Sequence, residues 1–302
     1  MVNTEVSLCG VQMKNPVMPA SGVYGFGTEY LDFYDPNILG AIVLKGSTQE
    51  PRFGNPQPRI AECREGMINS VGLQNPGINA VLHDELPRLR EIYSGPVVAN
   101  ISGFSVKEFA ACCEMADGAV DILEVNVSCP NVHGGGMSFG ATAEAAADVM
   151  RAVRRVVRRS PVFVKLSPNV RDITEIARAC EAEGADGLTL INTLLGMRID
   201  LRTRKPVIAN KMGGFSGPAI FPVALRMVYQ CAKAVGIPII GVGGIATADD
   251  VLEMMMAGAS AVQIGAENLR DPYACQKIIE ALPETMARYG IQSIQEIVGV
   301  TD

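Results

Sequence analysis

The sequence predicts an α/β fold in which eight parallel strands and their connecting helices close into a (β/α)8 barrel. Three observations lead to this fold class: a length of 302 residues, eight short hydrophobic runs, and helical periodicity between most of them. Repeated alternation of strand and helix favours a parallel sheet, and closure into a barrel is its most probable form for eight units. A doubly wound open sheet is the alternative, but no Gly-x-Gly-x-x-Gly sequence opens a helix after the first run.

Strands are expected where β-branched runs are bounded by Gly, Pro or Asn, as buried strands commonly are. These runs cover residues 17–20, 41–45, 97–101, 122–127, 162–166, 187–192, 237–242 and 261–265. The clearest helical patterns cover residues 106–119, 142–159, 172–184, 218–235 and 248–258. A weaker pattern at residues 80–93 is interrupted by Pro87. We interpret residues 1–302 as one domain, with residues 1–15 forming a short N-terminal hairpin or flap.

The extra length of the chain lies in three connections. Their glycine- and proline-rich parts, residues 46–77, 128–140 and 193–217, directly follow the second, fourth and sixth predicted strands. Loops that leave the carboxyl ends of barrel strands build the active site in this architecture. We therefore expect the functional residues at that end of the barrel.

The composition excludes several classes of protein. Hydrophobic residues make up 48% of the chain and charged residues 19%, which suits a buried core and excludes a disordered chain. A net charge of −6 argues against non-specific binding to nucleic acids or anionic membranes. No apolar run approaches the roughly 20 residues that span a bilayer, and the first residues do not resemble a signal peptide. We therefore expect a cytoplasmic protein.

The eight cysteines and two histidines form no recognisable metal-binding pattern. No Cys-x-x-Cys pair occurs, so neither a zinc site nor an iron–sulfur cluster is expected on this chain. We expect seven of the eight cysteines to be small buried hydrophobic residues in a reducing compartment.

Polar residues stand at the ends of the predicted strands. They are Ser21, Lys45, Asn100, Asn126, Lys165, Asn192 and Thr193. A lysine that ends a run such as residues 41–45 (AIVLK) is costly to bury without a polar partner. Lys165 can be explained by an ion pair with Glu124, but that pair does not explain the whole set. The set therefore predicts a converging polar site.

Glycines mark the ends of the last two strands, in residues 241–245 (GVGGI) and 264–266 (IGA). Barrels often bind phosphate there, because small residues let backbone amides approach the anion. Cys129 is the other notable residue, since it directly follows the fourth strand, between Ser128 and Pro130. Cationic neighbours would lower the pKa of such a thiol from about 8.5 toward neutrality, which suits a base or a nucleophile.

Five ordered motifs make the chain resemble the dihydroorotate dehydrogenases, which are flavin-dependent (β/α)8 enzymes of pyrimidine (UMP) biosynthesis. They are residues 69–75 (NSVGLQN), 126–132 (NVSCPNV), 164–168 (VKLSP), 191–193 (INT) and 213–218 (GGFSGP). The similarity extends from about residue 8 to residue 265 and beyond.

The resemblance implies one FMN across the mouth of the barrel. Its ring and ribityl chain would contact Ser21, Lys45, Gly46, Asn100, Asn126, Lys165 and Ile191, and its phosphate end would contact Gly217, Gly243, Gly244, Gly265 and Ala266. Lys165 would stabilise the anion that forms when the flavin is reduced. No metal is implied.

The resemblance also implies the substrate and the base. Dihydroorotate would bind to Lys45, Asn69, Ser70, Val71, Gly72, Leu73, Asn126, Asn131, Asn192 and Thr193. Lys45 would offset the substrate carboxylate. Cys129 would remove a proton from the ring CH₂ while the neighbouring carbon passes hydride to the flavin.

A cysteine base is typical of the cytosolic class, whereas the serine-type enzymes are membrane-associated through an N-terminal extension. Residues 133–136, 167–173 and 200–206 resemble the NAD-linked subgroup, in which a second subunit carries FAD and a [2Fe–2S] cluster. The chain itself lacks a dinucleotide fingerprint and cluster ligands. We therefore expect NAD⁺ as the final acceptor and a homodimer core within a heterotetramer.

Other functions stay open at this point. A fumarate-linked dihydroorotate dehydrogenase and a dihydropyrimidine dehydrogenase-like subunit share the cysteine, and Lys45 argues against the second because uracil-type substrates lack a carboxylate. A Schiff-base lyase would use Lys165 as its nucleophile. A non-catalytic barrel that scaffolds a partner gives no reason for Cys129 and Lys165 to stand at the mouth.

Overall fold

A parallel eight-stranded sheet forms the centre of the molecule. The computed structural model describes residues 2–128 and 139–301. The strands are β3 (Val17–Pro19), β4 (Ile42–Val43), β7 (Val97–Ile101), β8 (Ile122–Asn126), β9 (Val162–Lys165), β10 (Gly187–Leu190), β15 (Ile239–Val242) and β16 (Ala261–Ile264). Strands that follow one another in this series are neighbours in the sheet. The Gly40 N–H donates to the Val17 carbonyl oxygen at 2.9 Å and joins β4 to β3, so the predicted barrel is confirmed.

The register of the strands decides which side chains meet inside the barrel. Asn100 on β7 pairs with Glu124 on β8, and Asn126 on β8 pairs with Lys165 on β9. The residues of these strands are all buried, which is why the sequence shows continuous hydrophobic runs with single polar interruptions. Each interruption places one polar side chain inside the barrel, at a height set by the register of its strand.

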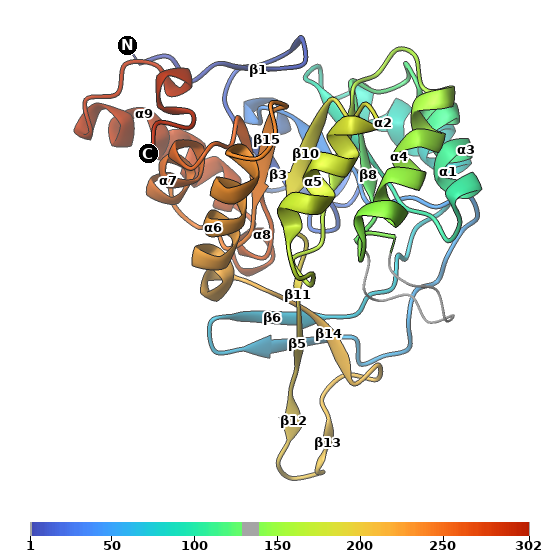
Figure 1. The fold of residues 1–302 in the computed structure, drawn as a ribbon. Coiled ribbons are helices and arrows are strands. Elements are labelled where there is room, and N and C mark those ends of the chain that lie inside the picture. The colour runs from blue at the N-terminus through green and yellow to red at the C-terminus, as the bar shows by residue number, and fades with distance from the viewer. Residues whose placement is uncertain (1, 129–138, 302) are drawn as a thin grey trace.

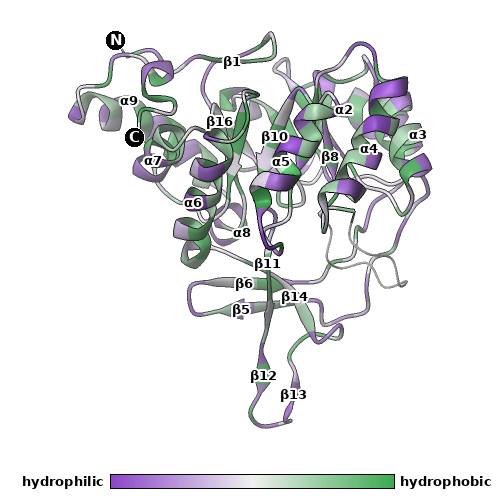
Figure 2. Ribbon diagram, in the orientation of Figure 1, coloured by the Kyte–Doolittle hydropathy of each residue, from purple (hydrophilic) through white to green (hydrophobic). Residues whose placement is uncertain are grey.

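The predicted helices surround the sheet (Figure 1). They are α3 (Val106–Ala116), α4 (Ala143–Val156), α5 (Ile173–Ala182), α6 (Phe221–Ala232) and α7 (Ala248–Met256). Ser105, Thr142, Asp172 and Thr247 cap the first turns of α3, α4, α5 and α7 by accepting backbone hydrogen bonds. Figure 2 shows hydrophilic and hydrophobic residues alternating along α4 and α5, as expected for helices with one buried face.

The weaker helical pattern is also helical in the structure. Helix α1 (Ile78–Ala80) continues through a π-helical turn, η3 (Val81–Glu85), into α2 (Leu86–Arg90). Pro87 lies in the first turn of α2, directly after the wider turn. The helical path continues through Pro87 to Arg90, so the proline does not break it.

Two connections predicted as loops contain strands, which is a correction to the sequence analysis. Strands β5 (Ile60–Cys63), β6 (Gly66–Asn69), β11 (Leu194–Met197) and β14 (Met212–Ser216) form an antiparallel sheet in the order β11-β14-β6-β5. A hairpin of β12 (Ile199–Asp200) and β13 (Lys205–Pro206) projects from it, away from the barrel (Figure 1). The glycines in β6, β11 and β14 hid these strands from a propensity argument, because glycine is disfavoured in strand interiors.

The remaining elements lie at the two ends of the chain or in short turns. The predicted N-terminal hairpin is present as β1 (Val6–Leu8) and β2 (Val11–Met13). Sequence analysis missed α8 (Glu267–Arg270) and α9 (Ala274–Arg288), which has Pro283 in its interior. The short helices are η1 (Thr28–Tyr30), η2 (Pro36–Ile38), η4 (Pro218–Ile220) and η5 (Ile294–Ile297). Within the described ranges, no helix is long and apolar enough to cross a membrane.

Candidate active site

A cavity opens at the carboxyl ends of the barrel strands, where the sequence analysis placed the site. It encloses about 1300 Å³ outside the protein atoms, including its open mouth. Every one of the eight strands, or the residues directly after it, contributes to the lining. Ligand pockets combine apolar walls with a few convergent polar groups, and the lining of this cavity has that composition.

The residues predicted for cofactor and substrate binding converge on this cavity. The lining includes Ser21, Lys45, Gly46, Asn69, Val71, Gly72, Leu73, Asn100, Asn126, Lys165, Ile191, Asn192, Thr193, Gly217, Gly243, Gly244, Gly265 and Ala266. Ser70 is the exception among the described residues, because its side chain is fully buried and does not line the cavity. Cys129 and Asn131 lie outside the described residues.

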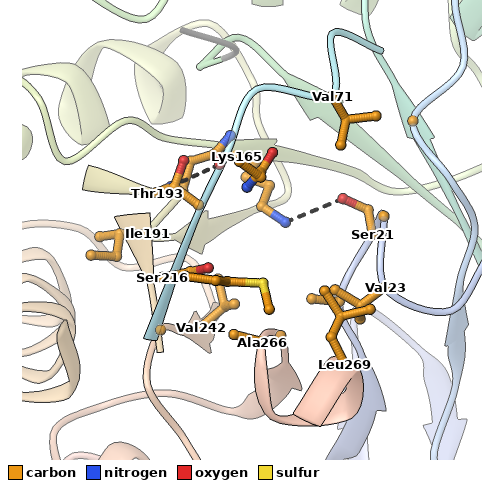
Figure 3. Close-up of a pocket in the computed structure, with 18 of the residues that line it drawn as sticks. Ser21, Val23, Val71, Lys165, Ile191, Thr193, Ser216, Val242, Ala266 and Leu269 are labelled. Carbon is orange, nitrogen blue, oxygen red and sulfur yellow. Dashed lines mark hydrogen bonds between the residues drawn. The ribbon is translucent and has the colours of Figure 1, made fainter. Parts of the chain in front are cut away.

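The small antiparallel sheet forms one wall of the cavity, which sequence reasoning missed. Met67 and Asn69 on β6 and Ser216 on β14 line it, and Ile60 on β5 lies at its edge. The other lining residues not predicted are Ala20, Gly22, Val23, Ile220, Val242 and Leu269. Figure 3 shows Val23 and Leu269 close together at the apolar side of the pocket. These residues carry no polar signal in the sequence, so position next to a strand end was the only clue to them.

A buried ion pair lies beneath the cavity. The Lys165 ammonium lies 3.4 Å from Glu124 Oε1, and the side chains are 6% and 0% exposed. Lys165 Nζ also donates to Gln263 Oε1 at 3.1 Å and to Ser21 Oγ at 3.5 Å, the second contact drawn in Figure 3. The ion pair considered in the sequence analysis therefore exists. Lys165 lines the cavity as well, so the pair and the polar site are parts of one arrangement.

An oriented chain of side-chain amides runs from Glu124 to the cavity wall. Asn100 Nδ2 donates to Glu124 Oε1 at 2.6 Å, and Asn126 Nδ2 donates to Asn100 Oδ1 at 3.5 Å. Asn192 Nδ2 donates in turn to Asn126 Oδ1 at 3.2 Å. A carboxylate accepts hydrogen bonds and cannot donate them, so this chain fixes which way each amide faces. Sequence analysis identified the three asparagines but not their common direction.

Small residues form the opposite end of the cavity, after β15 and β16. Gly243 and Gly244 have φ angles of +133° and +76°. A Cβ atom on Gly244 would lie 2.6 Å from the backbone nitrogen of Phe221, the first residue of α6. The loop after β15 therefore packs directly on the start of α6, and a side chain at this point would force the two apart.

The seven cysteines among the described residues divide into two groups, which corrects one expectation. Cys112, Cys113, Cys180, Cys231 and Cys275 are buried as expected. Burial raises the pKa of the thiols of Cys112, Cys180, Cys231 and Cys275 to about 12, so these groups are neutral near pH 7. Cys9 is exposed and Cys63 is partly exposed, because they lie in the outer β1–β2 and β5–β6 hairpins rather than in the core.

The fold and the cavity define a (β/α)8 barrel protein with a polar-lined site at the carboxyl ends of its strands. Comparison with known proteins adds the family: the model of a family described as dihydroorotate dehydrogenase matches residues 3–286. The chain therefore belongs to the dihydroorotate dehydrogenase family of oxidoreductases. This membership favours a flavin-dependent dehydrogenase over the Schiff-base lyase and the non-catalytic scaffold.

Curated relatives agree with this family over nearly their whole length. A protein of Halalkalibacterium halodurans, "Dihydroorotate dehydrogenase B (NAD(+)), catalytic subunit", is 55% identical over 301 residues, which is 99% of this chain and 98% of that protein. Proteins with the same description from Bacillus pumilus and Enterococcus faecalis are 52% and 50% identical. They are covered over 96% and 94% of their lengths, and this chain over 99% and 97%.

The Gly244 contact gives a prediction about stability. Gly244→Ala combines a left-handed backbone position with a clash against the Phe221 backbone, so it should lower the free energy of unfolding by at least about 2 kcal/mol. Gly265→Ala is the matched control, because its Cβ would meet nothing closer than Ala20 Cβ at 4.0 Å and should change stability by less than about 1 kcal/mol. Urea denaturation of both variants measures the difference, and equal stabilities would contradict the packing argument.

Proposed function

We propose that this protein oxidises dihydroorotate to orotate with FMN as its cofactor, in pyrimidine biosynthesis. The carrying observation is that the predicted cofactor residues, contributed by all eight strand ends, line one cavity in a chain of the dihydroorotate dehydrogenase family. The relatives compared above bear the name of that activity.

The chemistry of the cavity fits FMN. A flavin has apolar ring faces, a polar edge and an anionic tail, and the cavity offers a matching surface for each. Ile191 and Val242 supply apolar contacts, and Asn100 and Lys165 supply polar ones. The tail would lie at the small-residue end, among Gly217, Gly243, Gly244, Gly265 and Ala266, where a Cβ at Gly244 would already clash with the backbone. When bound, FMN supplies the acceptor for hydride.

The substrate residues fit a planar ring that donates and accepts hydrogen bonds and carries a carboxylate. Asn69, Asn126 and Asn192 bring amides from three separate elements to the same cavity. Lys45 lies beside Gly22, where a Cβ would be 3.5 Å from its Nζ, and it would face the substrate carboxylate. Val71, Gly72, Leu73 and Thr193 also line this cavity and would contact the substrate. Ser70 would support this lining from behind, since it is fully buried and its backbone N–H and carbonyl bond the Arg59 carbonyl and the Asn55 side-chain amide.

Cys129 would be the base. Cys129 directly follows Ser128 and stands three residues after Asn126, which lines the cavity. The thiolate would take a proton from one ring carbon as hydride leaves the neighbouring carbon, so that the ring gains a double bond. Asn131, in the same segment, would contact the ring.

The electrons would continue to NAD⁺ through a second subunit. The relatives are named catalytic subunits of an NAD⁺-linked enzyme, which implies a partner. We propose that the partner carries FAD and a [2Fe–2S] cluster, that two copies of this chain form the core of a heterotetramer, and that the enzyme is cytoplasmic. The whole chain would act as one FMN-binding domain.

The direct test is a visible spectrum of the purified protein before and after anaerobic dihydroorotate. We expect a yellow protein whose flavin absorbance bleaches on addition of substrate. A yellow protein that dihydroorotate fails to bleach would contradict the substrate, and a protein that retains no added FMN would contradict the cofactor. Dihydrouracil is the matched control, because it lacks the carboxylate assigned to Lys45, and it should bleach the flavin at least tenfold more slowly.

Cys129→Ser tests the base. A thiol with a pKa near 8.5 is a few per cent thiolate near pH 7, whereas a serine hydroxyl is almost wholly protonated, so the first-order rate of flavin reduction near pH 7 should fall by at least 10²-fold while FMN stays bound. Stopped-flow absorbance measures the rate. Cys63→Ser, in the outer hairpin, is the control and should reduce at the wild-type rate; unchanged reduction in Cys129→Ser would remove Cys129 from the mechanism.

The acceptor is tested by turnover with NAD⁺. The isolated chain should reduce its FMN with dihydroorotate but produce no NADH at a comparable rate, because no dinucleotide fingerprint follows a strand. Addition of the partner subunit should restore NADH formation. Full NAD⁺-linked turnover by the isolated chain would overturn the proposed subunit arrangement.

A further inference from the structure

Glu124 is a fully buried carboxylate that the proposed reaction does not use. It lies on β8, below the cavity, and its side chain has no exposed surface. Four groups surround it: Asn100 Nδ2 and Lys165 Nζ contact Oε1, at 2.6 and 3.4 Å, and Thr189 Oγ1 and Gln263 Nε2 contact Oε2, at 2.9 and 2.5 Å. Three of the four can act only as donors, and the hydroxyl of the fourth is free to donate. Such a cage suits the ionised form, so a negative charge lies beneath the cavity.

This charge is directly coupled to the residues that face the ligand. Asn100 and Lys165 both line the cavity and both contact the same oxygen of Glu124. Gln263 links the two sides, because its Nε2 donates to Glu124 while its Oε1 accepts from Lys165. The ammonium of Lys165 therefore reaches the cavity with a fixed position and with a compensating charge close behind it.

We propose that Glu124 is a positioning residue that partly offsets the charge of Lys165 and thereby lowers the reduction potential of bound FMN. The inference rests on the proposed binding of FMN to this cavity. Reduction places negative charge on the flavin, and Lys165 favours that charge while Glu124 opposes it. Because Glu124 is buried and closely bonded, its effect is not removed by solvent screening. A lower potential makes reduced FMN a stronger donor for onward electron transfer.

The test is the two-electron midpoint potential of FMN in the purified holoenzyme, measured by equilibration with reference dyes without dihydroorotate. Glu124→Gln keeps the size of the side chain and removes its charge. It should raise the affinity for reduced FMN relative to oxidised FMN on the order of tenfold, which corresponds to a rise of about 30 mV. An unchanged or lower potential would overturn the proposal.

A second comparison does not need the single Glu124 variant to fold. Lys165→Met leaves Glu124 with three donors and should lower the potential, whereas Lys165→Met combined with Glu124→Gln leaves no unpaired charge and should lie about 30 mV above Lys165→Met. Equal potentials in these two proteins would overturn the proposal. Thr189→Val is the structural control, because it removes one hydrogen bond to Glu124 without changing a charge. It should change the affinity for reduced FMN relative to oxidised FMN less than twofold.

The outcomes separate this inference from the proposed function. A wild-type protein that binds FMN but is not bleached by dihydroorotate would refute the proposed substrate and leave the potential measurements intact as a test of Glu124. A bleached wild-type protein whose potential does not respond to Glu124→Gln would refute this inference alone. A protein that never binds FMN would refute both.

Discussion

The buried carboxylate of Glu124 bonds side chains from four other strands and so connects the interior of the barrel. Its partners come from β7, β9, β10 and β16, so one side chain on β8 fixes the relative positions of five of the eight strands. A buried charge is costly unless every partner is in place, and removal of one member of such a pair typically costs 3–5 kcal/mol. The arrangement therefore penalises any shift in register between these strands. The same contacts fix the positions of two cavity-lining side chains, because Asn100 and Lys165 both bond Glu124 and line the cavity.

The barrel was predictable because its signals are local and repeated. Hydrophobic runs located all eight strands, and the polar residue that interrupts or ends a run, such as Asn126 or Lys165, located the site. These side chains were also expected to lie close together, because the carboxyl ends of parallel strands lie at one end of a barrel. The pair of Glu124 and Lys165 was foreseeable because Glu124 stands two residues before Asn126 on the same strand, so both side chains face the interior of the barrel.

The small sheet was not predictable in the same way, because its pairing joins segments far apart in the chain. Phe215 on β14 pairs with Ile68 on β6, and neither strand shows a clear alternation of polar and apolar residues. The partners of Glu124 were missed for another reason. Thr189 and Gln263 each stand inside an otherwise apolar run, which was a usable signal, but their meeting point depends on the register of the closed barrel. The segment that holds Cys129 and Asn131 lies outside the described residues, so their roles stay proposals.

The wall built by β5, β6, β11 and β14 has a consequence for the order in which the molecule is completed during synthesis. The β5–β6 hairpin leaves the ribosome early, but an isolated two-stranded hairpin has little stability in water. Its partner strand β14 ends at Ser216, so the four-stranded wall has no complete set of strands until that residue has been added. Until Ser216 has been added, the pocket residues on the barrel strands already made are not covered by the four-stranded sheet. The four-stranded wall is therefore completed in the second half of the chain, after β3, β4, β7, β8, β9 and β10 have been made and before β15 and β16 supply the rest of the lining.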